Sequence, residues 1–243
     1  ETFKEGIDLG PDLAYGEARV VAGDPLREPT PLPPDALLPG WRAAAAAYFR
    51  AMETVGATLM HAIARGLGLG EDIFDDAFAG GISTLRLIRY PPRTPDSMAG
   101  LAENELWVEQ GGRRHYMLGR AHVDSGLVTL LAQDGVAGLQ ARAASGTWMD
   151  VPPEEGALAV NFGKLLERWT GGRIRATEHR VIGQASSGPG MARHSIPFFY
   201  EPRADALVCR SHQGAAGLGT PLQADAGLSD PGVSRQRIRS RII

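Results

Sequence analysis

A histidine and an aspartate two residues apart, His122 and Asp124, have the types and spacing to bind a metal ion. They lie in a run rich in apolar and β-branched residues, 119–131, that predicts a β-strand. Side chains two apart on a strand point to the same face, so we expect the imidazole and the carboxylate to converge on one point. One further imidazole would complete the two-histidine, one-carboxylate facial triad, which holds Fe(II) and leaves coordination positions open.

His179 is the best candidate for the third ligand, because it lies in a second β-rich run, 173–182, that follows a glycine-containing turn. His61 lies in an alanine-rich helical pattern, and His212 lies in a segment without strand character. His115 ranks low, because on a regular strand its parity is opposite to that of His122, although a bulge at the glycine between them could break the count.

A second pair with a common face follows near residue 193. Arg193 and Ser195 are two apart in a predicted strand, so a guanidinium and a hydroxyl face the same way, as suits a bound carboxylate, while His194 points to the opposite face. Charge favours the combination. Fe(II) with one aspartate keeps one positive charge, and a dianionic 2-oxo diacid together with one buried arginine makes the assembly neutral, which avoids the desolvation penalty of an uncompensated buried charge.

These residues occur together with four further motifs, in the segments 85–91, 138–140, 160–163 and 197–202. Taken jointly and in this order, over roughly residues 3–205, they resemble the Fe(II)/2-oxoglutarate-dependent oxygenases of the isopenicillin N synthase-like family. The resemblance implies a mainly β fold with flanking helices, whose core is a double-stranded β-helix (jelly roll). It also implies that His122, Asp124 and His179 hold iron, that Arg193 and Ser195 bind the distal carboxylate of 2-oxoglutarate, and that Tyr90 lends its hydroxyl to the co-substrate or the substrate.

The implied activity is oxidative decarboxylation of 2-oxoglutarate by O2, coupled to hydroxylation or a related oxidation of a small molecule. An iron-dependent oxidase or cyclase that does not use 2-oxoglutarate is an alternative, because such members of the family keep an Arg-x-Ser pair too. A jelly roll that only binds a ligand is a second alternative. We expect a substrate pocket near the metal, flanked by Arg86, Ile88, Arg120, Asn161 and Phe199.

The composition is that of an ordinary globular protein, with 22% charged and 43% hydrophobic residues in a chain of 243. A formal net charge of −3 argues against a nucleic-acid footprint. Cys209 is the only cysteine, so no intrachain disulfide can form, and a reducing cytoplasm fits. No apolar run approaches the roughly 20 residues that a membrane-spanning helix needs, so we expect no membrane association, and the oligomeric state stays open.

We expect one oxygenase domain over 1–243 that lacks its N-terminal portion, because the family's chains begin earlier and residue 1 is Glu. A proline-rich extended segment, 1–40, is expected to wrap the core through apolar anchors that include Leu9, Leu13 and Tyr15. A long helix from 41 to about 65, with a stripe of Tyr48, Met52, Val55, Leu59 and Ile63, and a shorter one at 71–78 should buttress the barrel. The predicted jelly-roll core is 83–208, with an irregular tail at 209–243, and its strands are 83–90, 106–109, 113–118, 119–131, 138–141, 147–151, 157–162, 174–182 and 192–200.

Overall fold

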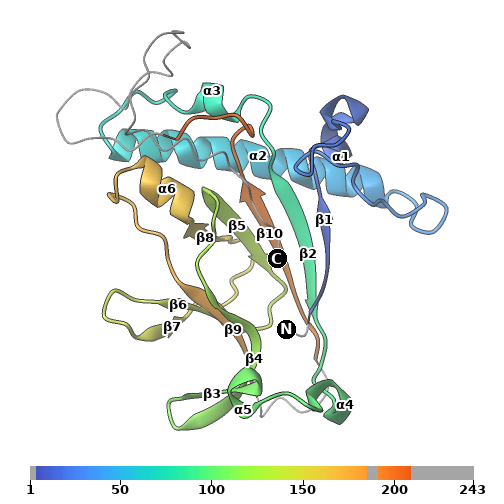
Figure 1. The fold of residues 1–243 in the computed structure, drawn as a ribbon, viewed down its shortest axis with the longest axis vertical. Coiled ribbons are helices and arrows are strands. Elements are labelled where there is room, and N and C mark those ends of the chain that lie inside the picture. The colour runs from blue at the N-terminus through green and yellow to red at the C-terminus, as the bar shows by residue number, and fades with distance from the viewer. Residues whose placement is uncertain (1–3, 185–190, 209–243) are drawn as a thin grey trace.

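The computed structural model describes residues 4–184 and 191–208 (Figure 1). Within these residues the strands form two antiparallel five-stranded sheets, with the orders β1-β2-β10-β5-β8 (sheet A) and β3-β4-β9-β6-β7 (sheet B). The strands are β1 (Glu5–Leu9), β2 (Thr84–Tyr90), β3 (Trp107–Gln110), β4 (Arg113–His122), β5 (Val128–Gln133), β6 (Leu139–Arg142), β7 (Trp148–Asp150), β8 (Ala159–Phe162), β9 (His179–Gln184) and β10 (Arg193–Tyr200).

The chain alternates between the two sheets, and this is why strands distant in sequence become neighbours. It passes from sheet A to sheet B after β2, returns after β4, and crosses again after β5, β7, β8 and β9. Side chains of both sheets meet in one inner cluster, formed by Tyr90, Leu118, Leu139 and Val181. This arrangement confirms the predicted jelly-roll core.

The opposite face of sheet A packs against a long helix, α2 (Trp41–Gly66), which runs across that sheet (Figure 1). Its alanine-rich start favours a helix, and the ring of Phe49 meets that of Phe198 edge-on at 5.0 Å. The predicted buttress is therefore confirmed, but one residue of the predicted stripe is wrong, because Val55 is 39% exposed. Gly56 faces the sheet instead, and its lack of a side chain lets the ring of Tyr200 approach the helix backbone.

The N-terminal segment is more regular than the sequence suggested. Residues 5–9 form β1, which pairs along its whole length with β2 and places Leu9 in the core. A short helix, α1 (Asp12–Tyr15), and a 3-10 turn, η1 (Glu17–Arg19), follow. Leu13 is buried as predicted, whereas Tyr15 is 43% exposed and its hydroxyl bonds to Glu53 at the surface of α2, so its prediction as a core anchor was wrong.

The predicted strand 119–131 is two strands separated by a loop. β4 continues through Gly119, where the pairing with β9 shifts register, and ends at His122, while β5 begins at Val128. The loop 123–127 between them carries the chain from sheet B to sheet A. A local apolar pattern cannot reveal this break, because both flanks have strand character.

The remaining elements are short. They are α3 (Asp75–Phe78), α4 (Pro95–Met98), α5 (Glu103–Leu106) and α6 (Lys164–Trp169). The first is shorter than the predicted helix 71–78, and β9 starts at His179 where the sequence predicted residue 174. The predicted tail, with Cys209 and His212, lies outside the described residues. Within the described part, no helix has the length and apolarity that crossing a membrane requires.

Candidate metal centre and co-substrate site

His122, Asp124 and His179 come together between the two sheets. The Nε2 atoms of His122 and His179 each lie 3.6 Å from Oδ1 of Asp124, and one potential ligand atom from each residue lies within 4.8 Å of the other two. The two histidines are opposite each other in the antiparallel β4–β9 pair, with ring centroids 4.3 Å apart. Asp124 reaches them from the loop after β4, so the prediction that it shares a strand with His122 was wrong, although the expected convergence occurs.

Both imidazoles are oriented by main-chain carbonyl groups. Nδ1 of His122 is 2.8 Å from the carbonyl oxygen of Arg120, and Nδ1 of His179 is 3.1 Å from that of Thr177. An N–H at Nδ1 donates in each bond, which leaves the lone pair of Nε2 directed at the centre. Burial lowers the pKa of His179, which favours the neutral imidazole that a metal requires.

The carboxylate of Asp124 is fixed by hydrogen bonds to one of its two oxygen atoms. Oδ2 accepts hydrogen bonds from Oγ1 of Thr129 at 2.6 Å and from Nδ2 of Asn161 at 2.8 Å. Oδ1 thereby remains directed at the imidazoles. Asn161 was predicted to flank the substrate, and the structure places its amide against this acid. Sequence reasoning missed Thr129, although the alternation along β5 puts it on the same face as Gln133.

Arg193 lies fully buried on the inner face of sheet A, with 2% of its surface exposed. Its Nη2 donates to Oε1 of Gln133 at 3.0 Å and its Nε to the carbonyl oxygen of Val136 at 3.3 Å. Nη1 is buried without a hydrogen-bond partner among the described residues. Burial lowers the pKa of Arg193, so its charge is costly there without an anion. A bound carboxylate fits this orphaned donor.

Ser195 and Tyr90 lie beside Arg193 on the same inner face. Both are buried, and Tyr90 is opposite Arg193 in the pairing of β10 with β2. Burial raises the pKa of Tyr90, so its hydroxyl stays protonated and able to donate. The guanidinium of Arg193 lies 5.5 Å from the centre of the Tyr90 ring. His194 is more exposed and bonds to Asp134, on the opposite face as predicted.

The other residues predicted to contact substrate have distinct settings. Arg86 forms a two-pronged ion pair with Asp8 of β1, with bonds of 2.5 and 2.6 Å, and its guanidinium lies 5.3 Å from the ring centre of Phe199. Ile88 packs against the inner cluster that contains Tyr90. Arg120 is bound by Glu105 in an exposed ion pair. Asp8 was not anticipated, because no local pattern links it to a residue 78 positions away.

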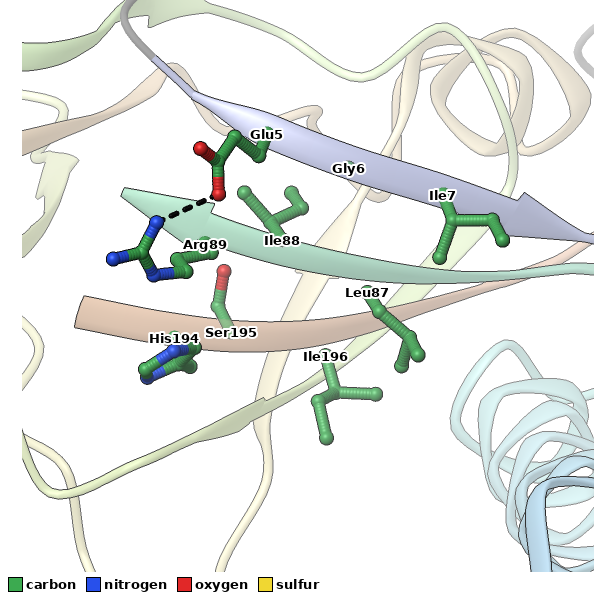
Figure 2. A pocket seen from close by; sticks show the side chains of 9 residues that line it. All are labelled: Glu5, Gly6, Ile7, Leu87, Ile88, Arg89, His194, Ser195 and Ile196. Atoms are coloured by element: carbon green, nitrogen blue, oxygen red, sulfur yellow. Dashed lines mark hydrogen bonds and ion pairs between the residues drawn. The ribbon is translucent and has the colours of Figure 1, made fainter. Parts of the chain in front are cut away.

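A separate hollow of about 490 Å³ lies along β1, β2 and β10 (Figure 2). None of the three clustered metal-binding candidates lines it, and its walls are mainly apolar. Ile7, Leu87 and Ile196 in its wall also pack against the core on the α2 side of sheet A. These residues place the hollow mainly on the α2 side of sheet A, although Ile88 and Ser195 of the inner-face group also contribute to it. It is lined by Glu5, Gly6, Ile7, Leu87, Ile88, Arg89, His194, Ser195 and Ile196.

A jelly roll in which two histidines and an aspartate converge beside a buried arginine is the architecture of a non-haem iron oxygenase. Residues 82–202 match the model of the 2OG-Fe(II) oxygenase superfamily, and the chain belongs to this superfamily. That family implies Fe(II), 2-oxoglutarate and O2 as cofactor and co-substrates.

Relatives with known names support the same assignment. The chain is 34% identical over 212 residues to a 2-oxoglutarate-Fe(II) type oxidoreductase of Aspergillus fumigatus, covering 85% of this chain and 56% of the relative. It is 31% identical over 207 residues to the 2-oxoglutarate-dependent dioxygenase citB of Monascus ruber, covering 84% of this chain and 58% of the relative. The chain thus spans little more than half the length of these relatives.

Among solved structures, the fold is similar to that of a full-length Neurospora crassa protein crystallised in complex with alpha-KG. The TM-score is 0.69 at 27% sequence identity, and the match covers 86% of this chain and 57% of the other. A complex of the same fungal protein with alpha-KG and thymine matches with a TM-score of 0.68, also at 27% identity, over 85% of this chain and 56% of the other.

Proposed function

We propose that this protein is an Fe(II)/2-oxoglutarate-dependent dioxygenase that hydroxylates, or otherwise oxidises, a small molecule. The observation that carries the proposal is the convergence of two imidazole Nε2 atoms and one carboxylate Oδ1 on a single point. Nε2 of His122, Oδ1 of Asp124 and Nε2 of His179 would hold the iron. When bound, iron supplies the redox chemistry that couples decarboxylation of 2-oxoglutarate to oxidation of the substrate.

The co-substrate would lie between this centre and Arg193. Thr129, which holds Asp124, and Gln133, which holds Arg193, are on the same face of β5 four residues apart, or roughly 13 Å at about 3.3 Å per residue. A five-carbon diacid and the arginine side chain together can bridge such a gap. Arg193 and Ser195 would bind the distal carboxylate, and the protonated hydroxyl of Tyr90 would donate to an oxygen of the co-substrate or the substrate.

We expect the substrate to lie on the side of the centre formed by Arg86, Ile88 and Phe199. Because Asp8 already pairs with Arg86, this guanidinium needs no anionic substrate as its counter-ion, which favours a neutral substrate over an anionic one. The Neurospora crassa complexes with thymine and with 5-formyluracil show that a protein of this fold binds small molecules. Asn161 would act through Asp124, and the exposed Arg120 would contact substrate only at the entrance. A single cysteine makes the cytoplasm the compartment that we propose.

The test is production of succinate from 2-oxoglutarate under O2, with a screen of metabolites for gain of one oxygen atom. We expect His122→Ala, Asp124→Ala and His179→Ala each to abolish iron-dependent oxygen consumption. His61→Ala is the matched control, because His61 also contacts a carboxylate, that of Asp75, but on α2 away from the centre. Full turnover by any of the three variants would contradict the ligand assignment, and oxygen consumption without succinate would favour an oxidase.

A further inference from the structure

Glu201, directly after β10, carries an acid group that none of the roles above uses. Its Oε1 accepts a hydrogen bond from the main-chain N–H of Leu127 at 3.2 Å. The same carboxylate fills the space beside Gly126, where even a Cβ atom would overlap Oε1. Glu201 therefore contacts the loop that joins β4 to β5, the loop that carries Asp124.

The same loop is held from another direction by main-chain groups at the start of α6. The N–H groups of Gly163, Lys164 and Leu165 donate to the carbonyl oxygens of Leu127, Asp124 and Gly126, at 2.9, 2.8 and 3.0 Å. Gly163 packs so closely that a Cβ there would overlap the carbonyl oxygen of Gly126. Glu201 adds a side-chain contact to the main chain of this loop, which backbone groups at the start of α6 hold from the other direction.

Glu201 is itself anchored at its main chain. Its N–H donates to Oγ of Ser83 at 3.1 Å, and this serine is 1% exposed. The side chain thus projects from a fixed point toward Gly126. Burial raises the pKa of Glu201 to about 8, and the charge of Asp124 adds to the rise. At neutral pH the group is a protonated acid, so it holds the loop without placing a second negative charge beside Asp124.

We propose that Glu201 is a positioning residue for the iron centre, which holds the main chain at Gly126 and Leu127 and thereby fixes the loop that presents Asp124. The proposal rests on the function proposed above, because it gives Asp124 the role of a metal ligand. Groups that orient metal ligands typically contribute 10–100-fold to metal affinity. Glu201 acts on Asp124 indirectly, through the main chain of the loop that carries this residue.

The experiment compares Co(II) binding, measured by calorimetry on the whole protein, in the wild type and in two variants. Glu201→Gln keeps an oxygen acceptor for Leu127 and is neutral, so we expect it to bind Co(II) as the wild type does. Glu201→Leu has a similar volume but no acceptor, and we expect its Co(II) affinity to fall by roughly 10-fold or more. Glu53→Leu is the control, because Glu53 is a partly buried glutamate on α2 with a raised pKa, away from the centre.

If Glu201 only stabilised the fold, Glu201→Leu would have a lower thermal unfolding midpoint but the same Co(II) affinity as the wild type. This result would overturn the proposal. If Glu201→Leu does not fold, Glu201→Asp takes its place, because its carboxyl is one methylene too short to keep the bond to Leu127. Equal Co(II) affinity of Glu201→Asp, Glu201→Gln and the wild type would then overturn it. Failure of the wild type to bind Co(II) would contradict the proposed function itself, which makes the two failures distinguishable.

Discussion

Two arginines on the inner face of sheet A satisfy their charges in different ways. Arg86 on β2 is held by both oxygens of Asp8, and these bonds raise its pKa. Arg193 on the neighbouring strand bonds only to the neutral oxygens of Gln133 and Val136 within the described residues, and burial lowers its pKa. The first arginine forms an ion pair in the fold, whereas the second forms none within the described residues and is influenced by the charge of Asp134 without a direct contact.

This difference separates two positions on the inner face of sheet A. An arginine cannot lose its proton in a protein, so the buried charge of Arg193 calls for an anionic ligand. Arg86 has no such need, because Asp8 already supplies the negative charge. Glu201 is a third case, since a buried acid without a cation can keep its proton. Of these three buried groups, Arg193 is therefore the one that we expect to bind an anion.

Among the variants that test this comparison, Arg193→Leu should have the largest effect. Removing the partner of a buried ion pair costs about 3–5 kcal/mol, so we expect the affinity for 2-oxoglutarate to fall by a factor on the order of 100 or more. Calorimetric titration of the Mn(II)-loaded protein with 2-oxoglutarate measures this. Arg86→Leu is the matched control and should change that affinity little. Similar losses in both variants would show that the two arginines are not functionally distinct.

The pH dependence of the free energy of unfolding tests whether Glu201 keeps its proton in the folded state. The folded pKa of Glu201, about 8, lies above the ordinary glutamate value of 4.5, so between these pH values the folded state keeps a proton that the unfolded state releases. Stability of the wild type should therefore fall by up to about 1.4 kcal/mol per pH unit across this window, relative to Glu201→Gln, and below it the difference should become constant. Urea unfolding of both proteins from pH 4 to 9 measures the difference between their free energies of unfolding. A difference independent of pH would mean that Glu201 is ionised in the fold.

The ion pair of Arg86 and Asp8 should have a smaller energetic effect. Their side chains are 21% and 30% exposed, and solvent screening at that exposure limits the coupling to about 1 kcal/mol. A double-mutant cycle with Asp8→Asn and Arg86→Gln, followed by urea unfolding, measures it. A coupling near zero would mean that Asp8 does not balance Arg86, and the predicted preference for a neutral substrate would lose its basis.

Tyr90→Phe should give the smallest change. Loss of one neutral hydrogen bond costs about 0.5–1.5 kcal/mol, so we expect the KM for 2-oxoglutarate or for substrate to rise about 2- to 12-fold. Steady-state kinetics with each varied separately identifies which of the two the hydroxyl contacts. Unchanged constants for both would leave Tyr90 as a packing residue beside Arg193.

Much of the fold could be predicted because its signals are local. Runs with strand character mark β2 and β10, and the alanine-rich run marks α2 to within one residue of its end. The sequence-based predictions were wrong where the tertiary structure went against the local residue pattern. Gly56 replaced Val55 on the buried face because the Tyr200 ring packs there, and β4 ends at His122 because the chain must change sheets.

The sequence by itself determined which residues are candidates for the site, because His122, Asp124, His179 and the Arg193-x-Ser195 pair stand out by residue type and spacing. Only the tertiary structure decided which other groups form hydrogen bonds to these residues and to the loop that carries Asp124. Asn161 lies 37 residues from Asp124, and Glu201 lies 74 residues from Leu127. Periodicity constrains only neighbours along a strand or helix, whereas pairings at such separations exist only once β8 and β10 have paired with β5 in sheet A.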